Sequence, residues 1–167
     1  VWAFFINSGN SELSGTGTVD LYEVIVRKAS SSDMVTFKRI FSAPDGFLTL
    51  DTGIFKIVGT YSFSNTFFKP QTGSGNCYIG SESEFWLDNP NVTVNGQPLA
   101  GNLYLRGSLK ISQGAVNVGT TGESSIIYDN SPPKKSKLTV SGGSLNVWTR
   151  ISPQTYATNL IDFDFST

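Results

Sequence analysis

The chain has 167 residues, of which 12 are basic, 13 are acidic and none is histidine. A formal net charge of −1 excludes a broad basic surface for a nucleic-acid backbone or an anionic membrane. The lack of histidine removes the commonest general base and the usual zinc and haem ligand, so we expect no cofactor and no metal site. Ser, Thr, Asn and Gly make up about 40% of the chain, a composition that disfavours long helices.

The lone cysteine and the two ends of the chain carry separate expectations. Cys77 lies in the apolar segment Cys77-Tyr78-Ile79, which predicts a small apolar residue in or beside a strand rather than a reactive thiol.

No signal peptide and no apolar run of about 18 residues is present, so we expect no membrane insertion. Both ends resemble cut ends, and we interpret residues 1–167 as an excerpt of a larger polypeptide.

Internal repetition is the strongest signal in the sequence. A ten-residue template alternates apolar residues on both sides of a central turn residue, which is Gly in three copies and Pro90 in the fourth. Period-2 alternation around such a corner predicts two short strands joined by a sharp bend. The four copies are Leu48–Ile57, Phe85–Val94, Leu109–Val118 and Leu138–Val147, and Val19–Val26 is a degraded fifth.

Two-strand units that repeat with the same corner favour stacked coils over a meander of β-hairpins. We therefore predict an all-β, single-domain parallel β-helix, or β-solenoid, with irregular loops between its strands. The stretch Asn65–Asn76 contains Pro70 and a run of turn-forming residues, which predicts the most exposed insertion. Short apolar segments between the copies predict the third strand of each coil; they are Tyr61–Phe63, Tyr78–Ile79, Leu103–Leu105 and Ile126–Tyr128.

Pairs of carboxylates are the first test for an enzyme, because glycoside hydrolysis needs two acids about 5–10 Å apart. Asp162 and Asp164, and likewise Glu82 and Glu84, hold alternate positions that face the same side of a strand. Their apolar neighbours favour the simpler interpretation of a half-buried strand with a polar outer face. The template keeps no row of acids, because the position that is acidic in two copies is serine in the other two. The sequence indicates no catalytic residues, and we expect a protein that is not an enzyme.

Outward aromatic side chains are the alternative to a catalytic site, because flat rings bind sugars. Trp86 lies between the inward residues Phe85 and Leu87, and Trp148 follows the last inward residue of its copy, so both are expected to face outward. They are candidate contacts for a surface glycan or a protein, although packing beneath a loop is the favoured interpretation. The basic run Pro132–Lys137 is interpreted as a solvated loop tip rather than an anion site.

Several stretches of the chain share a pattern with a known family. They are Val92–Gly96, Leu109–Gly119, Ser125–Tyr128 and Leu138–Val147, preceded by Gly15–Val26. Together they resemble the β-helical region of very large surface proteins of Bacteroidota that are exported by the type IX system. The resemblance spans about residues 13–151 and implies a right-handed parallel β-helix in an extracellular or cell-surface protein. It implies no ligand and no catalytic residues, and Pro90 departs from the corner Gly of the pattern.

These observations lead us to expect a structural or adhesive β-solenoid. Such a segment is a rigid stalk that spaces or displays other parts of a bacterial cell-surface or secreted protein. Two alternatives stay open. One is a carbohydrate-active β-helix, either a polysaccharide lyase or hydrolase or its inactive remnant, which needs acids that converge on one sheet face. The other is a glycan-binding module that uses outward aromatics such as Trp86 and Trp148.

Overall fold

The computed structural model describes residues 1–61, 66–97, 101–119, 124–129, 136–154 and 162–164, and the regular structure of these ranges is entirely β-strand. The strands are β1 (Trp2–Phe5), β2 (Ser11–Leu13), β3 (Val19–Asp20), β4 (Glu23–Arg27), β5 (Met34–Phe37), β6 (Phe41–Ser42), β7 (Leu48–Ile57), β8 (Cys77–Ile79), β9 (Glu82–Gln97), β10 (Leu103–Leu105), β11 (Ser108–Val118), β12 (Ile126–Tyr128), β13 (Lys137–Val140), β14 (Ser144–Val147), β15 (Ile151–Pro153) and β16 (Asp162–Asp164).

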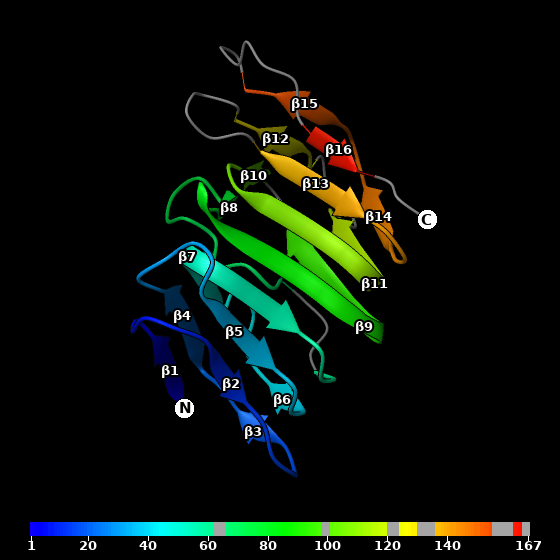
Figure 1. Cartoon of the computed structure of the whole chain (residues 1–167). Helices are drawn as coiled ribbons and strands as arrows, with labels where there is room; N and C mark the ends of the chain where they lie inside the picture. Colours follow the sequence, from blue (N-terminus) through cyan, green and yellow to red (C-terminus); the bar gives the residue numbers. More distant parts are fainter. Residues whose placement is uncertain (62–65, 98–100, 120–123, 130–135, 155–161, 165–167) are drawn as a thin grey trace.

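The strands form parallel sheets that stack as a solenoid of about six turns (Figure 1). The largest sheet has the order β1-β4-β7-β9-β11-β13-β16, with β5 also on β7, β2 on β5 and β14 on β11. A second sheet has the order β15-β12-β10-β8, and β3 pairs with β6. All the strand pairs described are parallel, which confirms the predicted parallel β-solenoid and excludes a hairpin meander over these ranges.

Inward side chains of successive coils lie above one another and form the core. The register places Phe55 opposite Val35 on one side and Phe85 on the other, and Phe85 in turn opposite Leu109. All four side chains are fully buried. The Phe55 ring also meets Phe37 edge to face, with ring centroids 4.8 Å apart. The core is therefore one continuous column, in which each coil buries apolar surface against the next.

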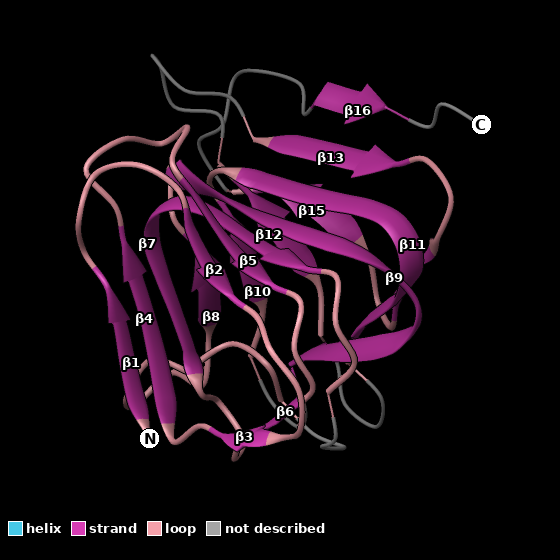
Figure 2. Ribbon diagram, turned by 60° about the horizontal axis from the view of Figure 1, so that its bottom comes forward, coloured by secondary structure: helices cyan, strands magenta, loops and turns pink. Residues whose placement is uncertain are grey.

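Glycine residues occupy the places where the backbones of neighbouring coils come closest. A Cβ atom on Gly114 would lie 2.5 Å from the carbonyl oxygen of Asn89, and one on Gly143 would lie 2.5 Å from the carbonyl oxygen of Gly114. The corners of the last three template copies, that of Pro90 included, are therefore stacked. Beyond Pro90 the predicted alignment is wrong, because register shifts at the corner between β9 and β11 pair Val116 with Val94 instead of Val92. Figure 2 shows the long strands β9 and β11 turning through this corner.

The first template copy, residues 48–57, is out of register with the other three. Phe55 and Ile57 pair with Phe85 and Leu87, so the second half of β7 lies beside the first half of β9. The template instead aligns the first half of β7 with the first half of β9. That part of the prediction is wrong, because alternation around a glycine occurs at two different corners of the coil and the pattern alone does not distinguish them.

Gly53, the glycine of this first copy, pairs with Ser83 at a second corner, where neighbouring coils also come close together. A Cβ on Gly80 would lie 2.8 Å from the carbonyl oxygen of Asp51, and one on Gly107 would lie 2.2 Å from the carbonyl oxygens of Gly80 and Ser83. The template position shared by Asp51 and Asp88 is therefore not shared in space, and the sequence-based equivalence of these two acids is wrong.

The predicted third strands are confirmed where the structure describes them. β8, β10 and β12 are three of the segments chosen, and they pair with one another in the second sheet. Tyr61 forms a single parallel bridge with Phe41, whereas Phe63 lies outside the described residues. The predicted exposed insertion is wrong at its start, because residues 66–68 are buried in the core and exposure begins at Lys69; Asn65 lies outside the described residues.

We predict that Gly107→Ala lowers the free energy of unfolding by about 1–3 kcal/mol or more, because the new methyl group would overlap backbone oxygens that cannot move aside independently. The measurement is urea unfolding followed by circular dichroism. Ser108→Ala is the matched control: it changes the adjacent residue, whose buried hydroxyl oxygen has no hydrogen-bond partner among the described residues, and is expected to be neutral. Equal stabilities for the two variants would contradict the close approach.

Cys77 is fully buried in β8, which confirms its interpretation as a small apolar residue, and burial raises the pKa of its thiol to about 12. We predict that the folded protein does not react with iodoacetamide at pH 8, whereas the urea-unfolded chain takes up one equivalent, as mass spectrometry would show. Rapid alkylation of the folded protein would contradict the burial.

The same burial makes stability depend on pH. The thiol of the unfolded chain ionises near its ordinary pKa, so the free energy of unfolding should fall as the pH rises above about 9.

Candidate functional site

A hollow lies where the first half of β7 approaches β8. We call it the corner groove; its volume is about 680 Å³. One wall is the first half of β7 and the other is Tyr78 of β8, with Gly80, Ser81 and Arg106. Residues 69–72, the exposed part of the insertion, form its rim. The groove therefore exists because an inserted segment stands beside an otherwise regular corner.

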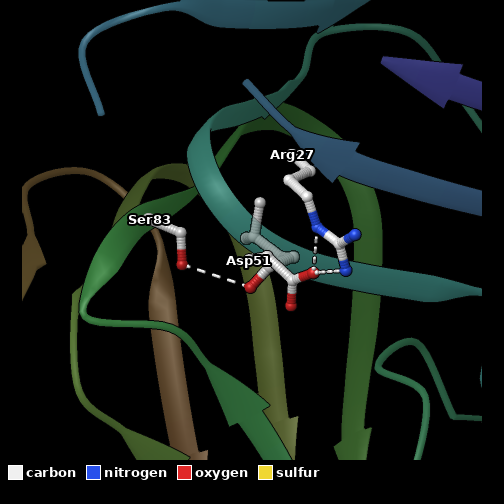
Figure 3. A network of polar contacts seen from close by, with 4 residues as sticks. Arg27, Asp51 and Ser83 are labelled. Atoms are coloured by element: carbon white, nitrogen blue, oxygen red, sulfur yellow. Dashed lines mark hydrogen bonds and ion pairs between the residues drawn. The ribbon is translucent and has the colours of Figure 1, made fainter. Parts of the chain in front are cut away.

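Asp51 contributes a carboxylate to the corner groove and uses it to bind the preceding coil. Arg27 donates to its Oδ2 atom from Nε at 3.0 Å and from Nη2 at 2.6 Å (Figure 3). A register shift between Val26 and Arg27 in β4 precedes this pair. Arg27 lies on the β4 side of β7, whereas Glu82 lies on the opposite, β9 side, where it pairs with Thr52. The Asp51 carboxylate is thus directed away from the acid that could otherwise form a catalytic pair with it.

A second ion pair lies at the rim of the corner groove. Lys69 of the rim binds Glu23, which is only 7% exposed. Removing a carboxylate from water is costly unless a cation compensates it, so Lys69 is held in place by the need to pair Glu23. Both Asp51 and Glu23 thus accept from cationic side chains, as charge-assisted pairs.

Aromatic and cationic side chains line the β8 side of the corner groove. The rings of Tyr78 and Tyr104 stack with centroids 5.0 Å apart and planes inclined by 18°. The guanidinium carbon of Arg106 lies 5.0 Å from the Tyr78 ring, and its Nε atom is 3.8 Å from Asp129. Register explains the stacking, because β8 and β10 pair Tyr78 directly with Tyr104.

Trp86 faces outward, as its place in the template predicts, but its ring is not an open platform. Register places Lys56 and Lys110 on the strands at either side of it, with their ammonium nitrogens 3.5 Å and 3.7 Å from the ring centroid. The indole nitrogen donates to the hydroxyl of Ser112 at 2.8 Å, and Lys56 also binds Asp88 at 2.8 Å. A sugar ring would have to displace a lysine to stack on Trp86.

Trp148 follows β14 and is 60% exposed, so the described residues do not cover it. Its backbone nitrogen donates to Val118 at 3.0 Å, which places it at the far end of β11. Trp86 pairs with Lys110 on the other side of the Gly114 corner. The structure therefore does not bring the two predicted tryptophans together in one site.

An aromatic cluster that sequence reasoning left unassigned lies at β1. Trp2, Phe4 and Tyr22 are 55%, 56% and 59% exposed. The Trp2 ring lies 5.1 Å from Tyr22 and 6.2 Å from Phe4, with the Trp2 and Phe4 planes inclined by only 9°. The sequence feature that could have predicted this cluster is the pair of aromatic residues at alternate positions, Trp2 and Phe4. Alternate residues share one face of a strand, and here that face is the outward one.

The two acidic pairs singled out in the sequence have different outcomes. Glu82 and Glu84 line a hollow of about 350 Å³ next to the corner groove, together with Ser81, Ser83 and Ser108. Asp162 and Asp164 belong to β16, but their side chains lie outside the described part of the chain. Residues 132–135 of the basic run also lie outside it, and Lys137 is exposed at the start of β13.

Two further findings concern only the residues that the structure describes. Within them, no three Cys, Asp or Glu side chains gather closely enough to hold a metal ion. Nor does that part of the chain contain a helix with the length and apolar character to cross a membrane.

Comparison with protein-family models, with curated proteins and with solved structures found no match for this chain.

Proposed function

We propose that this chain is a structural and adhesive β-solenoid segment of a bacterial cell-surface or secreted protein. The observation that carries the proposal is the uninterrupted core column, in which Val35, Phe55, Phe85, Leu109 and Leu138 follow one another from coil to coil. Parallel coils joined by such a column form a stiff spacer, because each coil is held by the coils on both sides. The resemblance to type IX-exported surface proteins supports the extracellular setting.

A non-catalytic role is part of this proposal. The corner groove contains a carboxylate, but Asp51 is engaged with Arg27, and the neighbouring Glu23 is engaged with Lys69. Hydrolysis of a glycosidic bond needs one acid that keeps its proton and a second that attacks or activates water. Asp51 and the neighbouring Glu23 each bind a cationic side chain instead.

Glycan binding is a second candidate function, favoured by a specific observation. The corner groove adjoins two smaller hollows and leads to the exposed Trp2 and Tyr22 rings. This function is compatible with an adhesive spacer, because a segment that displays a ligand-binding surface needs to be stiff.

The spacer proposal predicts one narrow distance distribution between spin labels placed at opposite ends of the described solenoid. Ser8→Cys and Thr149→Cys introduce exposed attachment points, while the buried Cys77 stays unlabelled. Pulsed electron spin resonance measures the distance. A matched sample that carries Gly107→Ala is expected to broaden it, because that substitution disturbs a corner between the labels. A broad or multimodal distribution in the unsubstituted background would contradict a rigid spacer.

The proposed lack of catalytic activity is tested separately, by an assay for polysaccharide cleavage. The protein, incubated with neutral and acidic polysaccharides, is expected to produce neither new reducing ends nor the ultraviolet absorbance of unsaturated uronides. Either signal, if Asp51→Asn abolished it, would replace the spacer proposal with the carbohydrate-active alternative.

A further inference from the structure

Three adjoining hollows form a row along the solenoid. The first, of about 220 Å³, is lined by Tyr22, Glu23 and Lys69 among others. Lys69 also lines the corner groove, so the two hollows adjoin at its side chain. Ser81 lines both the corner groove and the third hollow, which reaches Ser108. We call this row, from Tyr22 to Ser108, the long groove.

The long groove crosses several coils rather than following one. Its lining residues come from the coils of β4, β7, β9 and β11 in turn, as Glu23, Asp51, Glu82 and Ser108. Three steps between neighbouring parallel strands amount to about 14 Å. That length exceeds one pyranose ring, so the long groove suits an extended chain rather than a single small molecule.

One end of the long groove carries exposed aromatic rings. Tyr22 lines the first hollow, and its ring centroid is 5.1 Å from that of Trp2, which stacks on Phe4. Exposed apolar rings that are gathered in one place mark a binding surface, because a soluble protein otherwise gains by covering them. Flat rings of this kind pack against the C–H faces of sugars, and the indole N–H can hydrogen-bond to a hydroxyl.

The charge of the long groove favours uncharged polysaccharides over anionic ones. Its carboxylates outnumber its cations, Lys69 and Arg106, which disfavours uronate-rich, sulfated or phosphate-bearing chains. Its remaining polar groups are neutral hydroxyls and amides that suit the hydroxyls of a sugar, such as Thr49, Gln71 and Thr72. The lining carboxylates are Glu23, Asp45, Asp51, Glu82 and Glu84.

We infer that the long groove binds an extended, uncharged polysaccharide, with Trp2 and Tyr22 as its stacking platform. This inference deepens the adhesive part of the proposed function and rests on it. A rigid spacer without a ligand would keep its narrow spin-label distance but bind no polysaccharide, so failure of the inference is distinguishable from failure of the proposed function.

Affinity gel electrophoresis tests the inference with the full chain and four polysaccharides in the gel. Hydroxyethyl cellulose, xyloglucan and galactomannan are the uncharged probes, and polygalacturonate is the anionic probe. We expect retardation by at least one uncharged polymer and none by polygalacturonate. Retardation by none of the uncharged polymers, or by polygalacturonate alone, would overturn the inference.

Substitutions locate the binding surface. The double variant Trp2→Ala/Tyr22→Ala is expected to raise the Kd at least about tenfold, and Ser81→Trp, which would obstruct the junction of two hollows, should also weaken binding. Trp148→Ala is the matched control, because it removes an equally exposed tryptophan outside the long groove. Each variant is first checked for an unchanged urea midpoint.

The opposite pattern is equally informative. Loss of binding in Trp148→Ala, with none in the double variant, would move the ligand site to the residue chosen from the sequence and overturn the inference. Self-association of the unsubstituted chain in sedimentation, abolished by the double variant and accompanied by no polysaccharide binding, would make the aromatic cluster an interface between copies and overturn it as well.

Discussion

Close approach of neighbouring backbones at two corner columns is the constraint on which the rest of the structure depends. Hydrogen bonds between parallel strands fix the coil spacing at roughly 4.8 Å, so a corner has little room to move outward. Gly107 and Gly143 lie where even a methyl group would overlap carbonyl oxygens of the coil beneath. Once the corners are stacked in this way, the register of the strand stretches on either side is set, and register shifts at the bends take up the differences in length. The continuous core column is a consequence of that register.

The same register arranges the outer surface into ladders. Asn146 donates its side-chain amide to Asn117 at 2.9 Å, and Asn117 donates to Asn95 at 3.1 Å. Trp86 lies between Lys56 and Lys110 by the same rule, and its indole is covered by their ammonium groups as a result. Stacking therefore lets these outward side chains bind one another within the solenoid. The corner groove and the exposed rings of Trp2 and Phe4 lie where the regular ladder is interrupted, beside residues 69–72 and at β1.

Part of the candidate site could be foreseen from the sequence. The outward direction of Trp86 and Trp148 followed from period-2 alternation, since it depends only on the immediate neighbours of each residue. Whether each ring is open depended on other coils: lysines cover Trp86, and nothing in the described residues covers Trp148. The long groove had no local signature, because Glu23, Asp51, Glu82 and Ser108 are widely separated along the chain and meet only through stacking.

The sequence by itself determined that the chain is β-rich, that its strands alternate around corners, and that coils stack in parallel. Short-range patterns carry this information, because side-chain alternation and glycine corners involve residues only a few positions apart. Tertiary structure alone decided which corner stacks on which. Residues 48–57 match the template as well as the other copies do. In the structure, however, Phe55 packs beside Phe85 in the core, a pairing that the template alignment does not give. Such a choice is made by packing between distant coils, and no local pattern records it.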